Sequence, residues 1–468
     1  MRIHWHRRDL RVEDNRGLVG DGYDSAEPIL PVFVFDPGVL DHAGPPRIAF
    51  MLEGLASLRS RYRSLGSDLL VVDGDPTTAL PALAEEYEAD EVSWNHGYSG
   101  LARQRDLIVR EALADIDVDC KTASDGVLHE PGSIRTNDGD PYSVFTYFWR
   151  KWRERPKDSP VDAPSAALVA FTDETSIPSI DDLGFEPPEG TIPAASPEAA
   201  RDRLEAFCKD DIYRYEQRRD YPADRCTSRL SPHLKFGTIG IRSVYAATEA
   251  ALKSATDESS GESVRAFQSQ LAWREFYTQV LRFNPNVVTE NFKSYRHPIE
   301  WRDDPEALAA WKVGKTGYPI VDAGMRQLRE QAFMHNRVRM IVASFLTKDL
   351  LIDWREGYDW FRERLVDHDT ANDTGGWQWA ASTGTDAQPY FRIFNPTTQG
   401  ERYDPDAEYI REFVPELEGV PAETIHAWDE LDPGTRTMYA PDYPAPIVDH
   451  SERREQALAT FERARGKE

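Results

Sequence analysis

Short apolar runs alternate with stretches of helical periodicity in the first part of the chain. Residues 29–35, 68–72 and 91–94 form runs typical of buried strands. Beside them, apolar residues recur at spacings of three and four, which predicts helices around residues 47–65, 77–88 and 101–115. Strands that alternate with helices predict a parallel sheet with crossover helices. We therefore expect an α/β Rossmann-like domain over residues 1–128.

The pattern becomes helical from about residue 200. Spacings of three and four predict helices over 262–283, 307–311, 322–331, 336–354 and 358–365. Residues 200–468 are thus expected to form an all-α domain. The stretch between the domains holds 8 of the 32 prolines within residues 156–197 and has little periodicity, so residues 129–199 are interpreted as a linker. Two domains also suit a chain of 468 residues.

The formal charge of −26 argues at first against a nucleic-acid partner, because DNA is usually bound by basic surfaces. However, only 11 of the 55 basic residues are lysine. A lysine-poor, acid-rich surface is typical of proteins from a salt-rich, halophilic cytoplasm. Counterion release contributes little to DNA binding there, so local arginines and base stacking would have to supply affinity.

The sequence excludes several other classes of protein. No segment approaches the roughly 18 apolar residues of a membrane span, and no apolar signal segment is present, so we expect a soluble, cytoplasmic protein. The three cysteines lack metal or disulfide spacing, so no metal is expected. Neither G-x-G-x-x-G nor a P-loop occurs, which argues against a nicotinamide-dependent flavin oxidoreductase.

Tryptophan is concentrated in one part of the chain: seven of the twelve fall between residues 273 and 379. They occur with a series of distinctive segments, which are WHRRDLR at residues 5–11, TSRLSPHLKFG at 227–237, WREFY at 273–277, KTGYPIVDA at 315–323, MHNRVRM at 334–340 and GGWQWAASTGTD at 375–386. Together these segments resemble, in order and over nearly the whole chain, the photolyase/cryptochrome family. They are closest to the class I photolyases that act on cyclobutane pyrimidine dimers (CPDs).

The resemblance implies an FAD cofactor in the helical domain. Hydroxyls and backbone N–H groups ahead of Pro232 suit a diphosphate, because a helix N-terminus attracts anions, although a simple capping box explains this motif equally well. A carboxylate–guanidinium pair beside the flavin ring would favour a reduced, anionic flavin. The residues expected to contact FAD are Tyr215, Thr227, Ser228, Arg229, Leu230, Ser231, Asn336, Arg339, Asp367, His368, Asp369, Asp373 and Gly376.

The resemblance also implies light-driven repair of UV-damaged DNA by electron transfer from FAD to a flipped-out dimer. Trp377, Trp354 and Trp301 match the electron relay that leads from flavin to surface, and Trp273 and Trp379 match the pair that holds the dimer. Stacking worth about 1–3 kcal/mol per base would offset the cost of extrusion. The other expected contacts to the lesion or DNA are Arg219, Gln270, Arg274, Asn336, Arg337, Met340, Arg392 and Gln399.

Two positions depart from the family pattern. Gln270 stands where the better-known CPD photolyases carry Glu, and an amide can hydrogen-bond thymine but cannot donate a proton to the dimer radical anion. Asp373, next to flavin N5, replaces the usual Asn and is the residue found in plant cryptochromes. A carboxylic acid there could protonate a reduced flavin, which supports a cryptochrome-like photoreceptor as the alternative function.

Other features favour repair of CPDs over the alternatives. Plant cryptochromes lack the aromatic pair and extend into a long tail, and (6-4) photolyases have a His-x-x-x-His pattern that is not evident around His335. We expect a monomer with no obligate protein partner.

An antenna chromophore is also expected near the α/β domain. The family's folate-binding Asn-Glu pair aligns with Leu101 and Ala102, which cannot hydrogen-bond a pterin. This favours 8-hydroxy-5-deazaflavin, with Asp36, Arg47 and Lys235 as contacts, and an empty antenna site is the alternative.

Overall fold

In the computed structural model, which describes residues 1–20, 28–164, 167–173 and 175–466, five parallel strands form one sheet. Their order is β3-β2-β1-β4-β5. The strands are β1 (Arg2–His6), β2 (Ile29–Phe35), β3 (Leu70–Asp73), β4 (Glu91–Asn95) and β5 (Asp119–Ala123). The three expected strands are confirmed as β2, β3 and β4. The edge strand β5 has the sequence DCKTA and is partly exposed, so it lacks the apolar run that marks a buried parallel strand.

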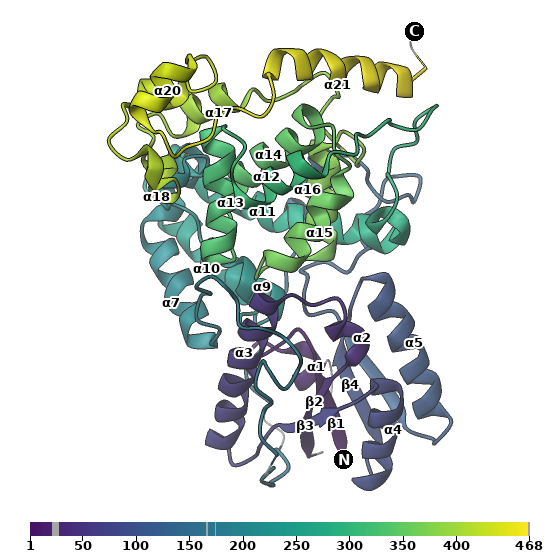
Figure 1. The fold of residues 1–468 in the computed structure, drawn as a ribbon. Helices are drawn as coiled ribbons and strands as arrows, with labels where there is room; N and C mark the ends of the chain where they lie inside the picture. Colours follow the sequence, from purple (N-terminus) through teal and green to yellow (C-terminus); the bar gives the residue numbers. More distant parts are fainter. Residues whose placement is uncertain (21–27, 165–166, 174, 467–468) are drawn as a thin grey trace.

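Helices cover both faces of this sheet (Figure 1). They are α1 (Arg16–Val19), α2 (Pro37–Leu40), α3 (Pro45–Ser64), α4 (Pro76–Glu86) and α5 (Gly100–Ala114). Phe50 and Leu58 of α3 pack with Phe33 on one face. Leu80 of α4 and Val109 of α5 pack with residues of the opposite face. The three helices expected here are confirmed, and the α/β architecture follows from burial of the sheet on both sides.

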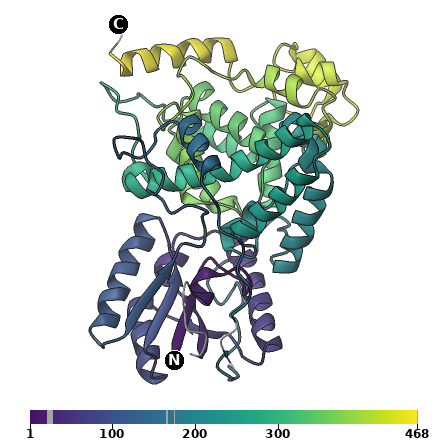
Figure 2. The same ribbon diagram turned by 180° about the vertical axis from the view of Figure 1, so that it is seen from behind.

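Most of the remaining chain is helical, and these helices lie above the sheet in Figure 1, with the view from behind in Figure 2. Its helices are α6 (Phe145–Glu154), α7 (Pro197–Lys209), α8 (Tyr215–Arg218), α9 (Ser231–Phe236), α10 (Ile241–Ser254), α11 (Glu258–Phe283), α12 (Pro305–Val313), α13 (Pro319–Gln331), α14 (Asn336–Ser344), α15 (Trp354–Arg364), α16 (Thr370–Ala380), α17 (Pro396–Tyr403), α18 (Glu408–Phe413), α19 (Ala422–His426), α20 (Pro433–Tyr439) and α21 (His450–Ala464).

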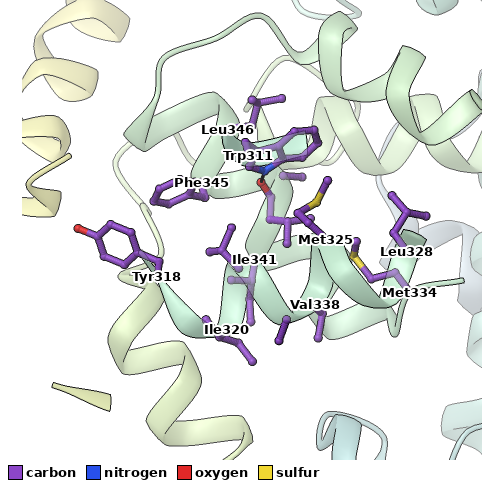
Figure 3. Close-up of a cluster of buried hydrophobic side chains, with 14 of the residues drawn as sticks. Trp311, Tyr318, Ile320, Met325, Leu328, Met334, Val338, Ile341, Phe345 and Leu346 are labelled. Atoms are coloured by element: carbon purple, nitrogen blue, oxygen red, sulfur yellow. Dashed lines mark hydrogen bonds between the residues drawn. The ribbon is translucent and has the colours of Figure 1, made fainter. Parts of the chain in front are cut away.

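The largest apolar core of the helical region lies around α13 and α14 (Figure 3). Trp311 of α12 is fully buried there, and its indole N–H donates to the Val342 carbonyl at 3.1 Å. This core supports the helices that carry the candidate site.

The single helix expected over residues 336–354 is wrong. Helix α14 ends at Ser344, a π-helical turn spans Phe345–Asp349, and Leu351 has a left-handed φ of 53°. Residues 341–350 are all buried, so this segment does not have one buried side and one exposed side. The helical period therefore could not report where the helix breaks.

The expected linker, residues 129–199, contains helix α6. Phe148 and Trp152 of α6 are buried in a core that also includes Leu204 of α7 and Phe276 of α11. We therefore propose that α6 belongs to the helical domain and that the linker proper follows it.

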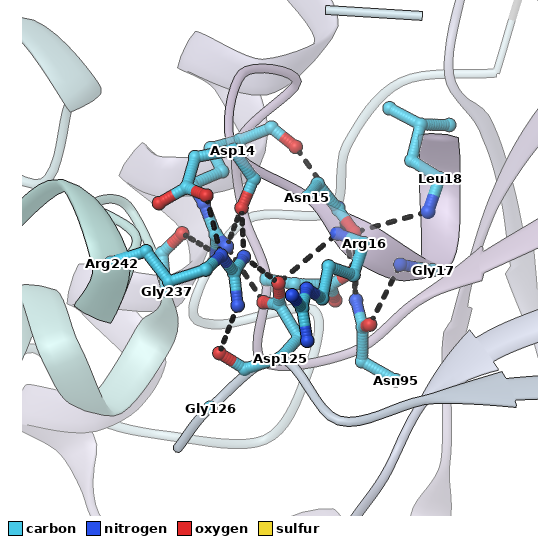
Figure 4. Close-up of polar contacts among 12 residues, drawn as sticks. Asp14, Asn15, Arg16, Gly17, Leu18, Asn95, Asp125, Gly126, Gly237 and Arg242 are labelled. Carbon is cyan, nitrogen blue, oxygen red and sulfur yellow. Dashed lines mark hydrogen bonds and ion pairs between the residues drawn. The ribbon is translucent and has the colours of Figure 1, made fainter. Parts of the chain in front are cut away.

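A buried ionic cluster joins the two domains (Figure 4). Arg242 of α10 lies 2.7 Å from Asp14 Oδ1 and 2.6 Å from Asp125 Oδ1, and Arg11 lies 2.7 Å from Asp125 Oδ2. These charges are almost completely removed from water. Gly240 is required beside them, because a Cβ there would lie 1.9 Å from Asp14 Oδ2. The cluster fixes how the helical domain sits on the sheet.

Candidate functional site

A carboxylate–guanidinium pair lies between α14 and the start of α16. Arg339 Nη2 donates to both carboxylate oxygens of Asp367, at 3.0 and 2.8 Å. Asp367 is buried, so the attraction is weakly screened by water. Arg339 Nη1 also lies 3.8 Å from Asp373 Oδ1. The structure thus brings together the expected pair and the residue expected next to flavin N5.

Asp373 also contacts a buried histidine. Its Oδ2 atom accepts the Asp369 N–H at 3.0 Å and lies 2.6 Å from His368 Nδ1. Burial lowers the pKa of His368 below its ordinary value, and the charge of Asp373 acts in the opposite direction. The Asp373 carboxylate thus offsets part of the effect of burial on His368.

The residues around this pair fit a dinucleotide cofactor. Gly376 faces open space, since a Cβ built there meets no atom within 4 Å. The loop before α9 turns at Arg229, whose φ is 49°, and no side chain caps the start of α9. Its first N–H groups are thus free to bind a phosphate. The Arg229 side chain instead donates to Gln331 at 2.8 Å. Tyr215 is buried.

The two expected lesion tryptophans retain exposed surface. Trp273 on α11 and Trp379 on α16 are both half-buried, whereas Trp311 and Trp354 are fully buried. Helices α11 and α16 are in contact. The approach is close because Tyr277 packs on Gly375, where a Cβ would lie 2.2 Å from the tyrosine ring. Partly exposed indoles on adjoining helices can accept a base on a free face.

The other expected DNA contacts have varied surroundings. Arg392 and Asn336 are exposed, and Arg219, Gln270, Met340 and Gln399 are half-buried. Arg337 pairs with Asp220 at 2.8 Å.

Arg274 is engaged elsewhere: its guanidinium donates to the carbonyls of Gly126 and Leu234 at 2.5 and 3.2 Å. These bonds direct the Arg274 guanidinium toward the domain boundary. They do not support a contact between Arg274 and DNA, which stays a prediction.

The three expected relay tryptophans differ in exposure. Trp377 and Trp354 are buried, and Trp301 is half-buried next to Phe461. The Trp354 indole N–H donates to Asn291 at 2.9 Å. The partial exposure of Trp301 is compatible with a place at the surface end, and the relay itself stays a prediction.

The three expected antenna contacts have different partners. Asp36 pairs with Arg105 at 2.9 Å. Arg47 donates to the Arg362 carbonyl at 2.7 Å and interacts electrostatically with Asp373, as does Lys235. A role of these three residues in an antenna site stays a prediction.

Sequence reasoning missed the cationic helix α6. Tyr147, Arg150, Lys151 and Arg153 are exposed, and the described part of the chain offers these three cations no ion pair. Phe145 at the start of α6 stacks on Trp273. The signal was available: residues 145–157 hold five basic residues and one acidic residue in a chain of charge −26.

One buried group has the composition of a metal site. His4, His6 and Asp9 offer ligand atoms within 4.8 Å of one another. However, the His6 nitrogens already bond Asp9 O and Tyr62 at 3.0 and 2.7 Å, and those of His4 bond Ser93 and Asp9 at 3.1 and 3.2 Å. This is a hydrogen-bond network, because a metal needs free lone pairs.

No helix among the described residues is long and apolar enough to cross a membrane.

Comparisons with known proteins cover nearly the entire chain. The DNA photolyase family profile matches residues 2–166, and the profile for the FAD binding domain of DNA photolyase matches residues 267–463. The deoxyribodipyrimidine photo-lyase of Halobacterium salinarum is 64% identical over 481 residues, which cover 100% of both chains.

Solved structures agree. A class III photolyase from Agrobacterium tumefaciens has a TM-score of 0.91 and 36% identity, covering 100% of this chain and 98% of that one. A Sulfolobus tokodaii photolyase with two FAD molecules has a TM-score of 0.83 and 32% identity, covering 99% of each. With a close relative aligned from end to end and both profiles matched, this chain belongs to the DNA photolyase family and carries its FAD-binding domain.

Proposed function

We propose that this protein is a deoxyribodipyrimidine photo-lyase that repairs cyclobutane pyrimidine dimers in DNA with light. The observation that carries the proposal is the partial exposure of Trp273 and Trp379 on the contacting helices α11 and α16, since α16 also contacts α14, which carries Arg339 of the Arg339–Asp367 pair. Bound FAD would supply the photochemical electron that opens the cyclobutane ring. The protein's own task is then to extrude, hold and orient the dimer.

Each of the expected site residues has a physical role in that task. The two indoles stack on the flipped bases, and each stack is worth about 1–3 kcal/mol. The Gln270 amide and Asn336 hydrogen-bond the pyrimidine edges. Arg339 and Asp367 hold a fixed positive charge where a reduced flavin carries its negative charge. Exposed cations, including Arg392 and those of α6, contact backbone phosphates.

The finer assignments are part of the same proposal. For the antenna we retain 8-hydroxy-5-deazaflavin, with Asp36, Arg47 and Lys235 as its contacts, and an empty antenna site as the alternative. A second FAD is the competing antenna, because the Sulfolobus relative holds two. We further propose a monomer that acts on DNA in the cytoplasm without an obligate protein partner.

A repair assay in light and dark tests the proposal. Purified FAD-loaded protein is mixed with a dimer-containing oligonucleotide in molar KCl, and intact thymines are measured by chromatography. Light-dependent loss of dimers with no NAD(P)H consumption supports a photolyase. Light-dependent spectral change of the protein without loss of dimers would favour the cryptochrome-like photoreceptor.

A further inference from the structure

One face of Trp273 is covered by Phe145. The two rings are stacked, with centroids 3.7 Å apart and planes 11° from parallel. Phe145 is the first residue of α6 and is buried. The face of Trp273 that Phe145 covers is therefore closed to a base, which leaves the opposite face for stacking. This inference rests on the proposed function, in which that face holds the pyrimidine dimer.

The start of α6 is held by the loop that follows Trp379. The Phe145 N–H donates to Asp386 Oδ2 at 3.0 Å, and the Thr385 hydroxyl donates to the Ser143 carbonyl at 2.7 Å. Val144, the N-cap residue of α6, supplies no capping bond of its own. Asp386 thus replaces the local cap that a helix start normally requires.

The backbone of Asp386 is strained to make this bond. Its φ is 45°, in the left-handed region that costs a residue with a side chain on the order of 1 kcal/mol or more. Such a conformation persists only where its surroundings enforce it. Thr383 and Thr385 are buried, and Ser382, which is also left-handed with φ 67°, accepts a bond from buried Lys348 at 2.9 Å.

The contact between Tyr277 and Gly375 sets how close α11 and α16 lie. The rotation of the Trp273 indole depends on the rings packed against it. Phe276 meets it edge-on and Tyr277 meets it at 34°, with centroids 5.5 and 5.4 Å away, whereas Phe145 is stacked on its face at 3.7 Å. Asp386 links Phe145 to the segment that carries Trp379.

We propose that Phe145 and Asp386 are positioning residues that hold the free face of the Trp273 indole in a fixed orientation relative to Trp379. Asp386 fixes the first turn of α6, and the Phe145 ring then fixes the indole. Without either residue, Trp273 can rotate and stacks on an extruded base only part of the time. Binding of undamaged DNA, which requires no extruded base, does not depend on this arrangement.

The ratio of affinities for damaged and undamaged DNA tests this role. FAD-loaded variants are titrated in the dark with a dimer-containing oligonucleotide and with the undamaged sequence, by fluorescence anisotropy. Phe145→Leu keeps an apolar side chain but removes the flat ring. We expect it to weaken dimer binding by roughly five- to tenfold, within the range of one stacking contact, and to change undamaged binding by less than about twofold. Phe145→Tyr should restore the ratio.

Asp386 gives an independent measurement. Asp386→Ala removes the acceptor and should lower the ratio, whereas Asp386→Asn keeps an oxygen acceptor, tolerates a positive φ and should retain it. Phe148→Leu is the matched control, because Phe148 lies on the same helix but its ring contacts Phe276. Melting temperature and FAD content are measured for every variant.

The outcomes separate this inference from the proposed function. The positioning role is wrong if Phe145→Leu and Asp386→Ala both keep the wild-type ratio of affinities for damaged and undamaged DNA while Trp273→Ala lowers this ratio. If the Asp386→Ala and Asp386→Asn variants lose the ratio equally, the acceptor role of Asp386 is wrong. If the wild-type protein does not distinguish damaged from undamaged DNA, the proposed function fails and the inference fails with it.

Discussion

Gly357 faces the indole of Trp377 so closely that a Cβ at residue 357 would lie 2.0 Å from Trp377 Cη2. Gly357 lies three residues after Trp354 in α15, and residues at this spacing share a helix face. Helices α15 and α16 are in contact. The missing side chain at residue 357 therefore allows the segment carrying Trp354 to pack directly on Trp377.

Gly357→Ala should slow light-driven reduction of the bound FAD. The new methyl group must displace Trp377 or shift α15, and overpacking of this kind costs about 1–3 kcal/mol of stability. A larger gap between relay indoles slows electron hopping. The measurement is the rate of flavin absorbance change under steady illumination, with the melting temperature recorded beside it.

The matched control for this change is Gly261→Ala, a helical glycine whose nearest neighbours would lie 3.7 Å from a new Cβ. Repair by chemically reduced FAD should be unaffected in Gly357→Ala, since it does not use the relay. An unchanged photoreduction rate would show that this contact does not set the relay geometry.

Gln270→Glu should raise the yield of dimer splitting. The amide of Gln270 is half-buried, and its Nε2 atom donates to Ser269 at 3.1 Å and to the Ala266 carbonyl at 3.4 Å, so its oxygen is free for substrate. A carboxylic acid can donate a proton to the dimer radical anion, which an amide cannot. We expect a higher quantum yield with binding changed by less than about twofold. Equal quantum yields in both proteins would contradict the proposed effect of this departure.

The sequence predicted elements well where one face of a helix or both faces of a strand are apolar. Strand β2 and helices α3, α4 and α5 were expected within a few residues of where they lie. The pattern failed at β5, which is a polar edge strand, and at the π-helical turn Phe345–Asp349, where every residue is buried. A strand without an apolar run gives no signal of a buried parallel strand, and a segment buried on every side does not show where its helix ends.

The candidate site was predicted by resemblance, and residue types alone could not have placed it. Asp367 and Arg339 are 28 residues apart in sequence, and only the break after α14 brings α16 back against it. Local charge would have revealed α6, which was interpreted as part of a linker because prolines follow it. The stack of Phe145 on Trp273 joins residues 128 positions apart, and no local pattern predicts such a contact.

Replacing Arg150, Lys151 and Arg153 together with Gln should reduce the salt dependence of DNA binding. Each phosphate that the protein binds contributes about 0.9 to the slope of log K against log salt on duplex DNA. The slope should therefore decrease by about 0.9 for each phosphate that the variant no longer binds. The ratio of damaged to undamaged affinity should stay constant, because phosphates carry no lesion information. Binding is measured by anisotropy over a KCl series.

The matched control replaces Lys209 and Lys253, exposed cations at the ends of α7 and α10, with Gln. Their removal should leave the salt slope unchanged. An equal change in both sets of variants would mean that α6 acts only through net charge.

Arg242→Met should destabilise the protein by about 3–5 kcal/mol, because it leaves Asp14 and Asp125 buried without their shared cation. Buried pairs are screened little by salt, so the loss should be similar in low and molar KCl. Urea denaturation followed by fluorescence measures it. The exposed Arg61–Glu13 pair serves as control: Arg61→Met should cost less than about 1 kcal/mol. A small, salt-dependent loss of stability in Arg242→Met would contradict a stabilising role of the buried ionic cluster between the domains.

Glu275 should make the stability of the protein fall between mildly acidic and mildly basic pH. Burial raises the pKa of Glu275 from 4.5 to about 7, although the N–H groups of Leu128, His129 and Trp152 donate to its carboxylate. Because the folded pKa exceeds the unfolded one, the folded state binds more protons between these values. Its stabilising contribution is complete below about pH 4.5 and is lost as pH rises through about 7.

In Glu275→Gln this pH dependence should disappear. A shift of one pKa unit corresponds to about 1.4 kcal/mol, so the wild-type free energy of unfolding should fall by on the order of 3 kcal/mol across this range. The free energies are compared at about pH 4.5 and about pH 8 in constant molar KCl, with Glu262→Gln, an exposed position on the same helix, as control. Since Glu275 connects α11 to α6 and to residues 128–129, it supports both Trp273 and the ring stacked on it. A pH dependence as steep in Glu275→Gln as in the wild type would assign the effect to another buried acid, with Asp349 the next to replace because burial raises its pKa to about 6.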